Sequence, residues 1–443
     1  MHLRSFFLVL ALASSFTFGG EVKPEAIEDS MLKQWAAQLG AEDFETREKA
    51  QNNLRNAGVR AQAALEAAKK SGDLEVSSRA EQLLIPLQAR INKEHEFVWI
   101  AEHVGPLFGS DLKSPSFNPE NAQERVAVAQ LEGRGEPDSN LGWLAKTQEA
   151  DGHWDSVKHG AAKNADIEHT SFALLAFLGA GHTEKVGEFK DNVKRGVKWL
   201  CDHVGEDGGV RVSPDAEVDG IKQALVGLAL AESAGMANLK PTKELAQKVI
   251  DYSTEKHQVL DGEKHLGFGR SARSTKPDML TTMLFTMQLK SAKVAGLRVN
   301  AAAFDGVIEF IDSLDQKEKG YAMAAGEKPS ARATVAALLC RQFLGWKKDD
   351  LAPQVSVFLK QYGYPDENGS DDLFDWIGEL VTFQQGGDAW RNFNGGARTR
   401  ITGAQEHDGS VRPRGEWSGA GRVFSTAVGA LCLEIYYRYQ ALR

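Results

Sequence analysis

The chain of 443 residues has only three cysteines, no basic stripe and, after its first twenty residues, no long apolar run. Cys201, Cys340 and Cys432 lie far apart inside apolar stretches, so we predict buried thiols rather than a disulfide framework or a metal cluster. We expect no cofactor and no metal. The net charge of −9 comes from interspersed charges. This pattern argues against nucleic acid or an anionic membrane surface as the main partner.

The N-terminal residues have the pattern of a targeting segment. Arg4 supplies a short positive region, and "SFFLVLALASSF" is apolar for too few residues to span a bilayer. Small residues beginning at Ala13 and at Thr17 offer two signal-peptidase sites. We predict a signal peptide over residues 1–20 and an exported bacterial protein, periplasmic or extracellular, that is not transmembrane.

Residues 31–91 are polar, alanine-rich and helical in period. "DFETREKAQNNLRNAG" places Phe44, Ala50 and Leu54 near one face, and two further helices are expected after it. The segment 21–104 resembles a HEAT-like helical hairpin, whose units bury their apolar faces on neighbours and serve as docking surfaces. We therefore expect a protein partner to bind through residues 31–91.

A stretch rich in proline and glycine, residues 105–140, follows this segment. It is predicted to be a linker that contains one helix, Glu120–Leu131. Residues 141–443 are then expected to form a second domain.

Inside this second domain, elements of the stretch "WLAKTQEADGHW", Trp143–Trp154, recur at 195–210 and 405–411, and weaker copies stand at "HLGFG" (265–269) and "KGYAM" (319–323). Each copy precedes an apolar helix, and a fixed period of about 50 residues with two helices per unit indicates a repeat architecture. In most copies an Asp or Ser stands at the helix start, where its side chain can accept hydrogen bonds from unpaired backbone N–H groups. The residues that open these helices in phase are Asp166, Asp219, Asp278, Ser330, Asp372 and Arg422.

The individual residues of the stretch suit an architectural role. Gly152 is free to adopt positive φ in an Asp-Gly turn. Gln148 is expected to bond neighbouring backbone, and Trp143 and Trp154 bring apolar area to the seam between units. The alternative is that these tryptophans stack a ligand.

The pattern Trp-Leu-x3-Gln-x3-Gly-x-Trp is the QW motif, and residues 141–443 resemble the α/α toroid of squalene and terpenoid cyclases and protein prenyltransferases. "GGDAWRNFN" near the C-terminus also resembles exported bacterial toroid proteins of unassigned function. The resemblance implies an all-α fold of about six helix pairs in a closed double ring. The inner helices would line a central cavity and gather their N-termini at one end. A shared fold does not transfer an activity.

Cyclases of this family that protonate an alkene use an Asp-x-Asp-Asp-Thr motif at an inner-helix N-terminus, where a carboxylic acid stays protonated in a dry cavity. "DIEHT" aligns with this motif and makes Glu168 the candidate acid. His169 replaces the following aspartate, and Asp166 opens the motif. These three residues are the candidate catalytic residues.

The other chemistries of the family are poorly matched. Protein prenyltransferases bind zinc through an Asp-x-Cys pair and a His, and Ile221 stands where the thiolate is needed. The Gly-Cys-Gly-Glu-Gln thioester motif is missing. "SDDLFD" at 370–375 comes nearest to an Asp-Asp-x-x-Asp diphosphate motif, and its acids are more typical of a helix cap.

If the toroid is correct, one rim of the ring collects polar side chains. The simple interpretation is that the aspartates are N-caps and the other residues are solvated; the alternative is a polar binding rim above an apolar interior. The rim candidates for binding are Asp219, Lys222, Asp278, Arg332, Trp376 and Arg422, beside Asp166, Glu168, His169 and Asp372. The interior candidates are Phe172, Leu175, Met283, Phe285, Met287 and Trp376.

Three functions remain open. The degenerate motifs favour a non-catalytic binding or scaffolding protein that uses the cavity or rim for an apolar, isoprenoid-like or envelope ligand. The second is a cyclase- or prenyltransferase-like enzyme acting on an isoprenoid or lipid. The third is an enzyme that acts on a cell-envelope polymer through the rim carboxylates. A carboxylic acid buried in a dry aromatic cavity would favour the second.

Overall fold

The computed structural model describes residues 28–41, 43–84, 87, 137–366 and 371–438. The chain divides at residue 95 into two compact units, each with its own apolar core. The predicted signal peptide and the predicted helix Glu120–Leu131 lie outside the described residues. Among the described residues, no helix is long and apolar enough to cross a membrane.

The N-terminal unit consists of short helices packed in hairpins. They are α1 (Asp29–Gln38), α2 (Phe44–Ala57), the helical turn η1 (Gly58–Ala61), α3 (Gln62–Ala68) and a helix over residues 74–84. The carboxylates of Asp43 and Asp73 accept backbone hydrogen bonds from Thr46 N (2.8 Å) and Glu75 N (2.9 Å). Acceptors at this position satisfy unpaired N–H groups at a helix start. They explain why α2 and the 74–84 helix begin where they do.

The buried face of α2 agrees with the sequence period at two of three positions. Ala50 and Leu54 are each 1% exposed, but Phe44 is 63% exposed. Phe44 is the first residue of α2, so its side chain lies at the end of the helix rather than between helices. The Arg47 guanidinium lies 5.8 Å from the centre of its ring.

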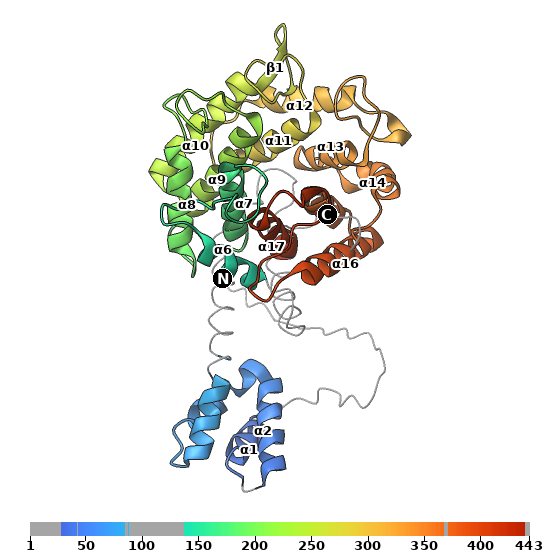
Figure 1. The fold of residues 1–443 in the computed structure, drawn as a ribbon. Coiled ribbons are helices and arrows are strands. Elements are labelled where there is room, and N and C mark those ends of the chain that lie inside the picture. The colour runs from blue at the N-terminus through green and yellow to red at the C-terminus, as the bar shows by residue number, and fades with distance from the viewer. Residues whose placement is uncertain (1–27, 42, 85–86, 88–136, 367–370, 439–443) are drawn as a thin grey trace, which may run out of the picture. The chain divides into compact units, whose positions relative to one another are not determined.

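The C-terminal unit is a double ring of helices (Figure 1). Within the described residues six inner helices each pack against the next, and α17 packs against α7 to close the ring. The inner helices are α7 (Asp166–Gly179), α9 (Gly220–Ala237), α11 (Met279–Val294), α13 (Ala331–Phe343), α15 (Asp372–Gln385) and α17 (Arg422–Arg438). This confirms the predicted all-α toroid.

An outer helix precedes each inner one. The outer helices are α6 (Pro137–Thr147), α8 (Lys190–Asp202), α10 (Lys240–Tyr252), α12 (Ala301–Ser313), α14 (Lys348–Tyr362) and α16 (Gly387–Ala404). Since α6 begins at Pro137, helical structure starts before the domain boundary predicted at residue 141. Helix α6 packs against both α17 and α7, so the first outer helix covers the place where the ring closes.

The sequence of each helix explains its layer. On α8 the buried residues are Val193, Gly196, Val197 and Leu200, a single stripe at helical spacing that faces the inner ring. Inner helix α7 is buried at every position from Ile167 to Leu178 except Glu168, because it is enclosed by outer helices on one side and the ring on the other. A helix apolar on nearly all sides is typical of such a position.

One segment departs from helix pairs. After α10 the chain makes a π-helical turn, η3 (Ser253–His257), and an antiparallel hairpin of β1 (Gln258–Asp261) and β2 (Lys264–Phe268). The stretch "HLGFG" was expected to be a weak copy of the repeat turn, and part of it forms β2. Phe268 stacks on Phe285 of α11 at 4.5 Å between ring centres.

In five of the six repeats, the same hydrogen bond joins the loop before an inner helix to that helix. The backbone N–H of Trp154 donates to Thr170 Oγ1 (3.2 Å), and the N–H of Val210 donates to Gln223 Oε1 (2.8 Å). Phe268 with Thr282, Tyr321 with Thr334 and Val411 with Thr426 repeat the bond at 2.9 to 3.0 Å. The acceptor always lies four positions after the residue that opens the helix. This bond is the shared physical element of the repeat.

The turn residues of the first repeat have the architectural role predicted for them. Gly152 has φ +110°, and a Cβ there would lie 2.3 Å from Arg195 O. Gln148 Nε2 donates to Gly152 O (2.8 Å) and Asn192 O (2.9 Å). Trp154 is fully buried, and its indole N–H donates to Leu144 O at 2.7 Å. Trp154 therefore has no face open to a ligand.

Candidate functional site

The loops that lead into the inner helices meet at one end of the ring, which we call the rim. Gly220 N at the start of α9 donates to Arg270 O (2.6 Å), and Met279 N at the start of α11 donates to Met323 O (2.9 Å), each in the loop of the next repeat. At the closure Arg422 N donates to His159 O (2.9 Å). The structure therefore brings the predicted rim residues to the same end of the toroid.

Three predicted helix starts are true N-caps. Asp219 accepts from Ile221 N (3.0 Å), Asp278 accepts from Thr281 N (2.9 Å), and Ser330 accepts from Ala333 N (3.2 Å). Asp219 also pairs with the exposed Arg270 at 3.0 Å. The side-chain oxygens of these three residues are therefore used to cap the helices.

Two other helix starts differ from the prediction. In α15 the capping side chain is Asp371, which accepts from Phe374 N (3.3 Å), and not Asp372. Asp166 makes no cap bond on α7, because its carboxylate instead accepts from Ser156 N and Oγ (2.8 and 2.7 Å) in the preceding loop. Burial opposes ionisation of Asp166, but the bonds from Ser156 and Asn164 outweigh it and lower its pKa.

Glu168 lies on the first turn of α7 and faces α9. Its Oε1 accepts from Lys222 Nζ at 2.7 Å, and both side chains are about one-fifth exposed. Its second oxygen, Oε2, is shielded from solvent and has no hydrogen-bond partner. A partly solvated carboxyl group in an ion pair differs from the dry, apolar setting that the cyclase motif requires.

His169 lies beside Glu168 and faces α17. It is 3% exposed, and its ring centre lies 6.1 Å from that of Phe424. Burial lowers the pKa of His169 to about 4, so its imidazole is neutral at physiological pH. Its Nδ1 is buried without a partner. A buried polar atom left unpaired costs about 1–3 kcal/mol and calls for an explanation.

Aromatic rings from three inner helices meet next to His169. Phe172 of α7 makes edge contacts with Phe424 of α17 (5.2 Å) and Trp376 of α15 (6.3 Å). These three side chains are 2–4% exposed. Trp417, in the turn η5 (Gly415–Trp417), stacks on Phe424 at 4.7 Å and is half-buried. Together they form an apolar wall below the rim.

The other interior candidates are all buried, but one points elsewhere. Leu175, Met283 and Met287 are at most 4% exposed and belong to the main core. Phe285 contacts Phe268 of β2 and lies 5.4 Å from His257, so it packs toward the hairpin and not into the ring. It is excluded from the wall.

A second group of acids lies at the start of α15. Asp371 accepts from Trp417 Nε1 (2.6 Å) and forms an ion pair with Arg332, whose guanidinium lies 5.4 Å from the centre of the Phe374 ring. Asp371 is 6% exposed. The predicted rim residue Arg332 is therefore part of the wall's polar edge.

Asp372 and Asp375 are more deeply buried than Asp371. Arg400 of α16 donates to Asp372 Oδ1 (2.7 Å), and its Nε lies 2.9 Å from Asp375 Oδ2. Ser425 donates to Asp372 Oδ2 (2.7 Å), and Tyr362 donates to Asp375 Oδ1 (2.8 Å). All three charged side chains are at most 3% exposed. Burial raises the pKa of Asp375 to about 7 despite the arginine.

Asp375 lies four positions after the cap of α15, where other repeats carry the Thr or Gln that binds the rim loop. Its bond to Tyr362, at the end of the preceding outer helix, replaces that tie. The acids of "SDDLFD" therefore join the last repeats to one another. The remaining predicted rim residue, Arg422, lies 3.6 Å from Asp408 and over Trp143 at the closure.

Arg400, Tyr362, Trp417 and Phe424 were not predicted. The acids that bind Tyr362, Arg400 and Trp417 are 13 to 46 residues away in sequence, and Phe424 contacts residues of the first repeat, so no local motif marks these pairs. A weak signal was available for Arg400: an arginine that falls on the buried stripe of an outer helix needs a buried counter-charge. Among the described residues, no group of three or more His, Cys, Asp or Glu side chains is placed to hold a metal ion.

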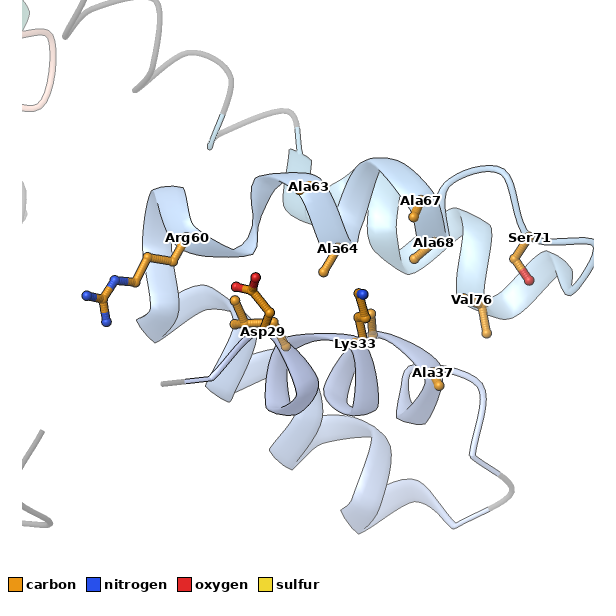
Figure 2. Close-up of a pocket in the computed structure, with 12 residues that line it drawn as sticks. Asp29, Lys33, Ala37, Arg60, Ala63, Ala64, Ala67, Ala68, Ser71 and Val76 are labelled. Carbon is orange, nitrogen blue, oxygen red and sulfur yellow. The ribbon is translucent and has the colours of Figure 1, made fainter. Parts of the chain in front are cut away.

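The N-terminal unit has a recess of its own. A groove of about 370 Å³ runs between α1 and α3 (Figure 2). Small side chains of both helices, including Ala37, Ala64 and Ala67, line it; Arg60 lies at one end and Lys33 near the middle. This groove falls within residues 31–91, where a partner was predicted.

Comparison with known proteins gives a fold and no family. No family model matches the chain, and no curated protein matches it. A family 76 glycoside hydrolase, an alpha-1,6-mannanase from Salegentibacter sp. HEL1_6, matches at a TM-score of 0.50 and 14% identity over 68% of this chain and 98% of its own. That structure is an inactive variant with two consecutive aspartates replaced, in complex with alpha-1,6-mannotriose.

Two other solved structures have different activities. A novel alpha-amylase from Clostridium perfringens matches at a TM-score of 0.49 and 11% identity, over 69% of this chain and 99% of its own. A type II terpene cyclase from Scytonema, in complex with geranylgeranyl dihydroxybenzoate, matches at 0.46 and 12%, over 68% and 96%. The match to the mannanase, at 14% identity, carries the fold alone.

Proposed function

We propose that the toroid is a ligand-binding protein without catalytic activity, and that its ligand enters at the rim between α7, α15 and α17. One observation carries the proposal: the acids that the structure describes at the starts of α7 and α15 are already paired with a cation or fixed by hydrogen bonds. Glu168 pairs with Lys222, Asp371 with Arg332, and Asp372 with Arg400. An acid catalyst needs a carboxyl that can give up or take a proton beside the ligand.

The cyclase alternative requires a protonated acid in a dry cavity. Glu168 is the aligned residue, but it is about one-fifth exposed and its Oε1 accepts a hydrogen bond from Lys222 at 2.7 Å, so its surroundings are not dry. Asp375 has the raised pKa that such an acid needs, but it is 0% exposed and bound to Tyr362 and Arg400. A proton there has no path to a ligand.

The hydrolase alternative rests on Asp371 and Asp372, two consecutive acids at an inner-helix start. The mannanase variant that matches this fold lost activity through changes at two consecutive aspartates. Here both acids are buried and face an arginine, so neither is positioned to attack or protonate a glycosidic bond. Binding without turnover fits this arrangement better.

We further propose that the protein acts outside the cytoplasm, as the leader pattern of residues 1–20 indicates. A fusion of residues 1–22 to a reporter should be exported and cleaved; an uncleaved cytoplasmic product would refute this.

A protein partner is proposed to dock through residues 31–91, where the alanine groove lets an incoming helix approach closely. Ala64→Arg, which fills the groove, should weaken that partner's binding.

The test of the binding role measures retention and turnover together. The chain without its leader is incubated with envelope glycans and with isoprenoid diphosphates, and the bound and released molecules are identified by mass spectrometry. We expect a retained ligand that is chemically unchanged. New reducing ends or inorganic diphosphate, formed by wild type and not by Asp371→Asn, would overturn the proposal.

A further inference from the structure

One face of the N-terminal unit is covered by small side chains instead of charged ones. On α2, exposed positions such as Glu45 and Lys49 carry charge. Along α1 and α3, the exposed positions beside the groove include Ala37, Ala63 and Ala67. A helix face that stays in water usually carries polar or charged side chains, so the alanine face is the one suited to contact another protein.

The groove between α1 and α3 can accept helices at close range. It has a volume of about 370 Å³, and the buried Leu32, Ala36 and Ala68 form its base (Figure 2). Alanine at a contact lets two helix axes approach to about 8 Å, the lower end of helix packing. Two neighbouring helices with small side chains between them therefore fit a second pair of helices, as in a four-helix bundle.

The charged side chains of the groove have both signs. Asp29 and Lys33 lie one turn apart on α1, and Arg60 lies at one end of the groove. Among the described residues neither Asp29 nor Lys33 has an ion-pair partner, although side chains at this spacing can pair with each other. A partner helix of a single charge sign would meet one like charge here. A second α1 running antiparallel would instead place each Asp29 opposite the Lys33 of the other copy.

We infer that two copies of the chain associate through this groove, with their α1 helices antiparallel about a two-fold axis midway between Asp29 and Lys33. Because such an interface is self-complementary, the pair of Asp29 with Lys33 forms twice. Helices α1 and α3 of both copies make a four-helix bundle with alanines at its centre. This inference rests on the proposed docking through residues 31–91 and identifies the partner as a second copy. Helices of 10 and 7 residues give a small interface, so we expect a dissociation constant on the order of 10 µM.

The first test measures the oligomeric state of the chain without its leader by sedimentation velocity between about 1 and 200 µM. We expect a monomer that converts to a dimer across this range. Ala64→Arg should weaken the association roughly tenfold or more, because the longer side chain fills the groove that the other copy occupies. Circular dichroism of each variant shows whether its helices are folded.

The second test exchanges charges to probe the antiparallel pairing. Lys33→Asp gives a copy with two acids at the interface, and Asp29→Lys gives one with two lysines. Each variant alone should associate roughly tenfold more weakly than wild type, since like charges then meet. Mixed in equal amounts, the two variants should form a heterodimer about as stable as the wild-type dimer, because every acid again faces a lysine. The matched control is Lys49→Asp on the charged face of α2, which should leave the association unchanged.

Three results would overturn the inference. The first is a chain that stays monomeric at about 200 µM. The second is a dimer that Ala64→Arg does not weaken, because its contact then lies outside the groove. The third is a mixture of the two charge variants that stays monomeric. The docking role fails or survives separately: it survives if a monomeric chain binds a different protein and loses it through Ala64→Arg.

Discussion

The starts of α7 and α15 occupy equivalent places in the ring and both carry clustered acids, yet their side chains do different work. At α15, Asp371, Asp372 and Asp375 each meet an arginine or a hydroxyl. At α7 the loop tie is kept by Thr170, and Glu168 and His169 each retain an unpaired buried atom. Acids at equivalent helix starts therefore do not share one role: those of α15 join repeats to one another, whereas Glu168 keeps one unpaired oxygen.

The largest expected effect comes from breaking the α15 cluster. Arg400→Met leaves Asp372 and Asp375 buried without their counter-charge, which should cost about 3–5 kcal/mol in the free energy of unfolding. Chemical denaturation followed by tryptophan fluorescence measures it. The control is Arg270→Met at the exposed pair with Asp219, expected to cost under about 1 kcal/mol. Equal losses in the two variants would show that the α15 cluster is not a structural tie.

The second prediction concerns the pH dependence of the α15 cluster. The pKa of Asp375 is raised from 3.8 to about 7, so folding favours its protonated form. This contribution is complete below about pH 4 and is lost as the pH rises through 7. Asp375→Asn should therefore gain stability relative to wild type between pH 4 and 8, by up to about 4 kcal/mol. A constant difference across that range would contradict the buried, proton-binding carboxyl.

The third prediction has the opposite sign and sharpens the contrast. The pKa of His169 is lowered from 6.5 to about 4, so folding favours its neutral form. Its contribution is complete above about pH 6.5 and is lost as the pH falls to 4, by up to about 3 kcal/mol. His169→Phe should thus lose less stability than wild type on acidification. If His169→Phe and wild type lose the same stability as the pH falls from 6.5 to 4, then His169 is open to water and is not part of a dry wall.

The smallest effect is expected at Glu168. Glu168→Gln removes an ion pair whose partners are partly solvated, so the free energy of unfolding should fall by less than about 1 kcal/mol. Chemical denaturation at pH 7 measures the difference. A loss of over about 3 kcal/mol would show that the pair with Lys222 behaves as a buried ion pair.

The ring itself could be predicted because its elements are local. Each repeat needs an Asp-Gly turn, a capping residue and an apolar helix, and all three lie within a few dozen residues of one another. The register of α15 was misassigned by one residue, since either Asp371 or Asp372 can open that helix by pattern. Only the hydrogen bond to Phe374 N distinguishes them.

The site was harder to predict because its contacts are long-range. Glu168 and His169 stood out from their likeness to a cyclase motif, but the lysine and the phenylalanine that they face come from other repeats. Asp166 was expected to cap α7, and its bonds to Ser156 replace that role. The β1–β2 hairpin also escaped prediction, because a short apolar run with glycine suits a turn and a strand equally.

The most direct test of the contrast between α7 and α15 compares the free energies of unfolding of Arg400→Met and Glu168→Gln at pH 7. The account predicts a loss of about 3–5 kcal/mol for Arg400→Met, because its acids are buried, and under about 1 kcal/mol for Glu168→Gln, whose ion pair is partly solvated. Equal losses in the two variants would contradict it.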